Sequence, residues 1–230
     1  MEKSLIEILN DQYENQPEIK LFVEAIAIYS GFPLATIIDT FVGNKAKELA
    51  LSRMRSFYDE LNNGEVKLNE TIIENNDFLH SYFAVVNYVI RSKSDEKANR
   101  FAKIIKSLYK KDVTLDQFED YTSIFNELTE REFTILCIKR EYEQNTTPNL
   151  AIFNLDKPRN SFQITSEYWD KFVKEVTQKL NIEKPELEAF LFRLQRTGCY
   201  MLHTGYYDIK NDGCGDTTII FQKIYDIVKD

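Results

Sequence analysis

The last third of the chain carries a helix pattern that runs directly into a strand pattern. Apolar residues recur with i, i+3, i+4 and i+7 spacing, which is one face of a helix: Leu187, Phe190, Leu191 and Leu194. Pro185 suits the first turn of this helix, because a proline there loses no helical hydrogen bond. Gly198 suits its end, because glycine adopts the left-handed conformation of a helix C-cap at little cost.

β-forming residues follow this helix over 199–207. Asn211, Asp212 and Gly213 then form a turn signal. Thr217 and Thr218 can cap a final apolar helix that contains Ile219 and Ile220. The expected order is therefore helix, short ribbon, helix.

Composition favours a folded, helical protein. The chain has 230 residues, of which 43% are hydrophobic, and it contains only 7 glycines and 5 prolines. Usual proteins contain about 7% glycine and about 5% proline, so this chain is poor in the residues that form tight turns and phosphate loops. Its length allows one large domain or two small ones.

Charge and cysteine content limit the partners and the compartment. The formal net charge of −8 argues against general affinity for nucleic acid or an anionic membrane, although a local basic face remains possible. Three scattered cysteines fit a reducing compartment better than a disulfide framework. The first residues do not form a signal peptide. We therefore expect a cytoplasmic protein.

The longest apolar stretch, over 21–42, predicts buried helices rather than a membrane span. A span needs about 20 largely uninterrupted apolar residues, whereas this stretch contains Glu24, Gly31, Pro33 and Asp39. We interpret it as two helices that meet near Gly31.

The first half, residues 1–112, predicts an α-helical bundle. Helical stripes occupy 46–61, 78–90 and 98–109. Ser94 stands where an N-cap belongs, and Asp95 and Glu96 follow at the positive end of the helix dipole. Asp77 can cap the preceding helix.

The second half, residues 113–230, begins with two helix-start signals. Thr114 with Gln117, and Thr129 with Glu132, have the spacing of a capping box. Residues 144–165 are expected to form a long connection, because Pro148 and other breakers interrupt the helical pattern. Within that connection 150–153 is a candidate edge strand, and Ser166 is the expected cap of the next helix.

This order of helices followed by a ribbon is typical of a winged helix-turn-helix. Residues 128–133 and 190–200 also resemble a group of uncharacterised bacterial helical proteins with a C-terminal winged-helix-like domain. Some of these are similar to phage-defence accessory proteins. The resemblance covers about half of the chain, and it implies a fold but no activity.

A winged helix could read DNA through its last helix. Ala189, Arg193 and Arg196 share one face of that helix, where two arginines could contact bases or phosphates. Lys184 at the helix start and Lys210 in the ribbon could add phosphate contacts. Glu186 and Glu188 oppose this function, because they occupy the turn that would enter the groove. The alternative is that the arginines are solvated or pair with these glutamates, and that the domain serves for protein docking or dimerisation.

Catalytic and metal-binding signals are weak. Cys199, His203 and Cys214 could form a metal or cysteine-dependent site, but their spacing matches no paired zinc motif. His80 lies in an apolar helix and is expected in the core or at its boundary. We find no hydrolase elbow, metalloprotease helix or phosphate loop, and we expect neither an enzyme nor a cofactor.

The sequence thus predicts a mainly α-helical binding protein. Its first expected activity is protein–protein docking or self-association through the winged-helix-like module. The apolar helices of residues 17–61 are a second candidate surface for self-association. The alternatives are a DNA-binding regulator and a phage-defence accessory protein.

Overall fold

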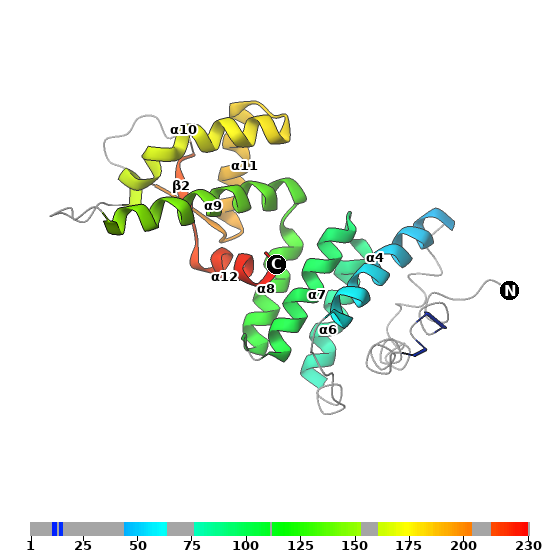
Figure 1. Cartoon of the computed structure of the whole chain (residues 1–230). Coiled ribbons are helices and arrows are strands. Elements are labelled where there is room, and N and C mark those ends of the chain that lie inside the picture. The colour runs from blue at the N-terminus through cyan, green and yellow to red at the C-terminus, as the bar shows by residue number, and fades with distance from the viewer. Residues whose placement is uncertain are drawn as a thin grey trace. The chain divides into compact units, whose positions relative to one another are not determined.

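The chain is mainly helical, as the sequence predicts, with one small antiparallel sheet (Figure 1). The computed structural model describes residues 11–12, 14–15, 44–63, 76–110, 112–152, 161–203 and 213–229. Two compact units divide the chain, Met1–Thr122 and Ser123–Asp230. The predicted boundary after residue 112 falls just before helix α8 (Leu115–Glu127), whereas the division lies within that helix.

Three helices of the first unit pack on one another: α4 (Asn44–Asn62), α6 (Asn76–Arg91) and α7 (Asp95–Tyr109). Ser94 caps α7 as predicted, because its side chain accepts a hydrogen bond from the backbone N–H of Lys97. Asp77 lies within the first turn of α6 rather than before it. The wider bundle over residues 1–112 stays a prediction, because most of residues 1–43 lie outside the described part.

Aromatic side chains fill the core of this unit. Tyr58 of α4 and Tyr82 of α6 are fully buried, and their hydroxyls lie 3.0 Å apart. Each hydroxyl is therefore the hydrogen-bond partner of the other, so neither buried phenol has an unpaired oxygen.

The second unit begins with α9 (Glu130–Ile152), whose start is the predicted capping box. The backbone N–H of Glu132 donates to Thr129 Oγ1 at 3.3 Å, and the backbone N–H of Thr129 donates to Glu132 Oε2 at 2.9 Å. Thr114 and Gln117 make the same reciprocal pair at the start of α8. Both capping boxes are confirmed.

The expected connection over 144–165 is wrong in its first part. Helix α9 continues through Pro148 to Ile152, so 150–152 is helical and not an edge strand. A proline removes one backbone donor, which weakens a helix without always ending it. In the turn before Pro148, the Thr146 hydroxyl donates to the carbonyl of Tyr142 at 2.8 Å, a contact typical of a slightly bent helix. Phe153 lies outside the described residues.

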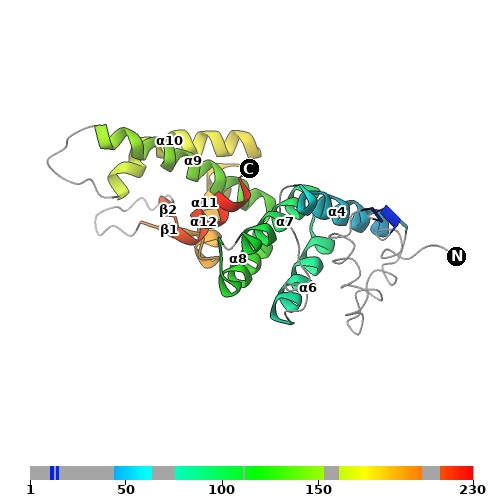
Figure 2. The same ribbon diagram turned by 60° about the horizontal axis from the view of Figure 1, so that its bottom comes forward.

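The next helix also begins earlier than expected. Helix α10 starts at Ser161 and ends at Leu180, so Ser166 lies inside it and does not cap it. Its apolar stripe is buried as expected, with Trp169 8% exposed and Phe172 and Val176 fully enclosed. Figures 1 and 2 both show α10 lying along α9.

Helix α11 (Lys184–Arg196) follows the predicted pattern closely. Pro185 lies in its first turn, and Leu187, Leu191 and Leu194 are buried. Gly198 has a φ of +74°, the left-handed conformation that ends a helix. The start and end of this helix and the three leucines of its stripe are confirmed, whereas Phe190, also predicted in the stripe, is only partly buried.

The ribbon consists of β1 (Tyr200–Leu202) and β2 (Gly215–Thr217), which pair antiparallel with Met201 opposite Asp216 (Figure 2). The sequence predicted a ribbon but did not place its second strand at Gly215–Thr217. Gly215 permits this pairing, because a Cβ there would approach the Met201 carbonyl oxygen to 2.2 Å. Thr218 then caps α12 (Ile219–Val228) as predicted, whereas Thr217 belongs to β2.

No helix within the described residues combines the length and apolar character needed to cross a membrane.

Candidate functional site

Helix α11 has two opposite faces, of which one is buried and the other is exposed. With 3.6 residues per turn, positions 185, 189, 192 and 196 lie opposite the buried leucines. Pro185, Ala189, Phe192 and Arg196 are all exposed, and Phe192 keeps 46% of its surface accessible. We name these four residues the outer stripe of α11. It begins with three apolar side chains, which is unusual for the solvent face of a helix.

Arg193 flanks the outer stripe and forms an ion pair with a buried carboxylate. Its Nε lies 2.9 Å from Oε1 of Glu132, although the N–H is not aligned for a hydrogen bond. The Glu132 side chain is completely enclosed, and its other oxygen accepts from the backbone N–H and the hydroxyl of Thr129. Arg193 therefore compensates a charge that is costly to leave unpaired.

The other predicted DNA contacts are dispersed along α11. Lys184 is exposed at its first residue and Arg196 is exposed in its last turn, while Lys210 lies outside the described residues. The expectation that Arg193 pairs with Glu186 or Glu188 is wrong. Glu186 instead lies 3.4 Å from Arg131 at the start of α9, and both of these side chains are about half exposed.

The candidate metal or thiol site receives no support from the geometry. Among the described residues, no group of three or more His, Cys, Asp or Glu side chains is placed to hold a metal ion, so Cys199, His203 and Cys214 form no such group. Cys199 is fully buried, and burial raises its pKa to about 11. Such a thiol is protonated at neutral pH and is a poor nucleophile. His80, expected in the core or at its boundary, is exposed.

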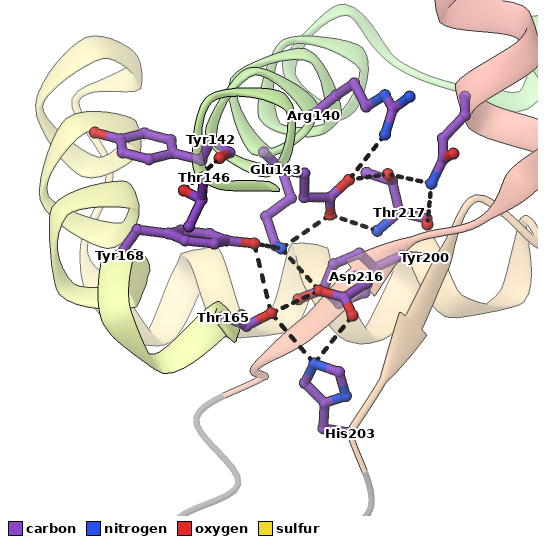
Figure 3. Close-up of polar contacts among 12 residues, drawn as sticks. Arg140, Tyr142, Glu143, Thr146, Thr165, Tyr168, Tyr200, His203, Asp216 and Thr217 are labelled. Atoms are coloured by element: carbon purple, nitrogen blue, oxygen red, sulfur yellow. Dashed lines mark hydrogen bonds and ion pairs between the residues drawn. The ribbon is translucent and has the colours of Figure 1, made fainter. Parts of the chain in front are cut away.

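A buried polar cluster, which the sequence analysis missed, joins the ribbon to α9 and α10 (Figure 3). At its centre Lys139 of α9, with no exposed side-chain surface, donates to three groups. These are the Tyr168 hydroxyl at 2.6 Å, a Glu143 oxygen at 2.9 Å and Asp216 Oδ1 at 3.3 Å. Three elements that are distant in sequence thus share one ammonium group.

The carboxylates of this cluster have further partners on the ribbon side. Glu143 accepts the backbone N–H of Thr217 at 2.8 Å and also the Thr217 hydroxyl. Asp216 accepts from the Thr165 hydroxyl at 2.7 Å and lies 3.3 Å from His203 Nε2. Strand β2 is therefore held to α9 and α10 by side chains as well as by its pairing with β1.

The electrostatics of the cluster favour its charged form. Burial alone would lower the pKa of Lys139, but Glu143, Tyr168 and Asp216 outweigh burial and hold this pKa above its ordinary value. Burial alone would raise the pKa of Asp216, but His203, Lys139 and Thr165 hold it below its ordinary value. At neutral pH the cluster thus contains an ammonium and at least one carboxylate in contact.

This arrangement suits structural support rather than catalysis. A hydroxyl–histidine–carboxylate relay needs the hydroxyl and the carboxylate on different ring nitrogens. Here His203 Nε2 faces both Asp216, at 3.3 Å, and Thr165, at 3.5 Å. A nucleophilic lysine needs a lowered pKa, whereas that of Lys139 is raised.

The sequence did contain a signal for this cluster. Lys139 follows Ile135 and Leu136 by four and three residues, which places it on their buried face. A lysine at a core position predicts buried acidic partners. The sequence does not identify these acidic residues, because Asp216 is 77 residues from Lys139 and meets it only in the folded chain.

No protein-family model matches the chain, and the searches of curated proteins and of solved structures found no match either.

Proposed function

We propose that the second unit, Ser123–Asp230, is a winged-helix-like module that binds another protein and carries out no catalysis. The order of α9, α10 and α11 followed by the β1–β2 ribbon supports the winged-helix assignment. The outer stripe of α11 is the binding surface in this proposal. It corresponds to the helix face that a DNA-binding winged helix would present to the groove.

The observation that carries this proposal is the exposed apolar surface of a helix whose opposite face is already buried. Phe192 is 46% exposed at the centre of the stripe, with Ala189 and Pro185 on its N-terminal side. Aromatic residues are enriched at protein interfaces and supply much of their binding energy. Surrounding polar residues would form the rim of such an interface.

Further exposed apolar residues lie close to the end of the same helix. The Thr218 hydroxyl donates to the Gly198 carbonyl at 2.6 Å, so α12 begins beside the end of α11. Ile219 and Ile220 follow directly and are 71% and 41% exposed. Exposed apolar side chains of this unit are therefore not confined to α11.

DNA binding remains the alternative, and the contacts of Arg193 weigh against it. An arginine whose Nε faces the enclosed Glu132 would lose part of that ion pair if it turned away to reach into a DNA groove. Glu186 in the first turn would also face phosphate oxygens. Arg196 and Lys184 are the residues that support this alternative, because both are exposed.

A site-specific photo-crosslinker tests the docking surface directly. Phe192 would be replaced by benzoylphenylalanine, which keeps an aromatic ring at that position. Gln178, exposed on α10, provides the control position. In cells of the source organism we expect a protein adduct from position 192 and none from position 178. The absence of any protein adduct at 192 would overturn the proposal.

A mobility-shift titration separates docking from DNA binding. Duplex DNA from upstream of the gene and a random duplex would be compared at two salt concentrations. Docking predicts no salt-sensitive shift with micromolar protein. A shift that is lost in Arg196→Ala and Lys184→Ala would instead support the regulator. The cytoplasmic location and the similarity to phage-defence accessory proteins stay predictions.

A further inference from the structure

We infer that the partner of the outer stripe is a second copy of this chain, bound through an antiparallel pair of α11 helices. This inference rests on the proposed docking function and names its partner. It differs from the self-association expected for residues 17–61, which lie largely outside the described residues. Three properties of α11 favour a second copy: the position of its small residue, the symmetry of its charges and the exposure of Phe192.

The charges beside the outer stripe are arranged with opposite signs at the two ends of the helix. Glu186 lies in the first turn and Arg193 in the last turn. At 100° per residue they lie on the same flank of the helix, because seven residues make almost two full turns. When two copies meet antiparallel about a two-fold axis, the same flanks become neighbours. Glu186 of each copy then lies beside Arg193 of the other.

Both charged side chains retain surface for such a contact. Glu186 is 48% exposed and Arg193 is 45% exposed, although each already has one partner within its own chain. The enclosed Glu132 holds the Arg193 side chain in place before association, so little side-chain entropy would be lost at Arg193 when the copies meet. The pair between Glu186 and Arg131 is about half exposed and constrains Glu186 only weakly. A parallel pair about a two-fold axis would instead place these two flanks on opposite sides of the interface, where Glu186 and Arg193 of the two copies do not meet.

The apolar residues fit the same symmetry. The midpoint between Glu186 and Arg193 lies at Ala189, which is exposed on the outer stripe. A small residue at the two-fold axis lets two helices approach to about 8 Å between their axes, the short end of the usual range. Phe192 of each copy then covers one side of the central contact, where its exposed ring would be removed from water.

The expected dimer is weak because the helix is short. Helix α11 has 13 residues and is therefore about 20 Å long. One such helix pair buries less than the roughly 1,200–2,000 Å² of a standard interface. We therefore expect a dissociation constant in the micromolar range, and concentrations of about 1–200 µM are needed to observe both states.

Sedimentation equilibrium of the full chain over this range tests the inference. Ala189→Glu places two carboxylates at the two-fold axis, and we expect it to weaken the dimer by more than about tenfold. Gln178→Glu adds the same charge on exposed α10 and should leave the dimer unchanged. Glutamate is a good helix former, so both variants should keep the helical circular dichroism of the wild type.

Two results would overturn the inference in this experiment. One is a wild type that stays monomeric at every concentration. The other is a dimer that Ala189→Glu and Gln178→Glu affect equally, because another surface would then make the contact. If the photo-crosslinker at 192 joins a different protein while the wild type stays monomeric, the docking function survives and only the second copy is wrong.

Cysteine crosslinking tests the orientation. In an antiparallel pair position 189 meets its own copy, whereas the two copies of position 196 lie about 20 Å apart, given a rise of 1.5 Å per residue. Ala189→Cys should therefore form a dimer with a short bis-maleimide, and Arg196→Cys should not. The wild type gives the background from Cys137, Cys199 and Cys214. Equal crosslinking at 189 and 196 would exclude the antiparallel arrangement.

Discussion

Replacing Lys139 by methionine tests whether the buried polar cluster holds the second unit together. Methionine has a similar length and no charge, so it removes the ammonium with little change in volume. The substitution leaves Glu143 and Asp216 without the cation that lies between them. Their side chains are only 11% and 21% exposed, so water replaces the ammonium incompletely.

The expected loss is about 3 kcal/mol in the free energy of unfolding. Removing one member of a buried ion pair costs about 3–5 kcal/mol. We expect the lower end, because Glu143 keeps its two bonds from Thr217, and Asp216 keeps Thr165 and His203. With a typical urea dependence of about 2 kcal/mol per molar, this loss moves the midpoint down by about 1.5 M.

Tryptophan fluorescence provides a readout specific to this unit. The chain contains one tryptophan, Trp169, which lies in α10 and is 8% exposed. Its emission during urea titration follows the second unit without a contribution from another indole. Lys174→Met, an exposed substitution on the same helix, is the matched control and should change stability by no more than about 0.5 kcal/mol.

A double variant tests the physical cause. In Lys139→Met the only cation left near Glu143 among the described residues is Arg140, at 3.7 Å. Adding Glu143→Gln removes this poorly compensated carboxylate, so it should recover about 1 kcal/mol or more. The reasoning would be refuted if Lys139→Met alone costs less than about 1 kcal/mol. It would also be refuted if the double variant is no more stable than the single one.

Three further predictions follow from named contacts. Arg193→Ala should destabilise the second unit by about 1–2 kcal/mol in urea titration, because it leaves the Glu132 carboxylate without its cation. Arg196→Ala, the control, should change the stability by less than about 0.5 kcal/mol. Equal effects of the two variants would contradict the ion pair. The lowered pKa of Asp216 means that its carboxylate stabilises the fold above about pH 3.9, the ordinary value. That contribution is lost as pH falls through the lower pKa of the folded state. Asp216→Asn should therefore reduce the stability at pH 7 and make the loss of stability below pH 4 less steep. Urea midpoints that are the same for the variant and the wild type across this pH range would refute this prediction. Cys199 is buried and has a pKa of about 11, so it should resist a thiol reagent at pH 8 until urea unfolds the chain. Mass spectrometry of the labelled peptides measures this reaction. Labelling of Cys199 in the native protein would contradict its burial.

Short-range patterns could be read from the sequence wherever neighbouring residues decide the structure. The capping boxes at Thr114 and Thr129 depend on residues three positions apart, and both form as predicted. The stripe of α11 depends on helical periodicity, and its leucines are buried. These features need no knowledge of the fold, because local hydrogen bonds and one helix face define them.

The sequence-based predictions failed where residues distant in sequence, and not the neighbouring ones, decide the local structure. Pro148 was expected to interrupt the helix, yet α9 continues to Ile152. Strand β2 has only three residues, and its position in the expected ribbon was not predicted. Such a short strand has almost no pattern of its own, and its identity depends on pairing with β1 and on the bonds that Glu143 and Lys139 make to it.

The sequence by itself determined the mainly helical class, the helix caps and the amphipathic character of α11, because these depend on residues within a few positions of one another. Only the tertiary structure decided the partners of the charged residues. Arg193 lies on the predicted exposed face, but the carboxylate beside it is Glu132, from the start of another helix. Lys139 and Asp216 likewise meet only because the ribbon folds back onto α9. A buried charge needs an opposite charge in space, and the spacing along the chain does not specify which one it meets.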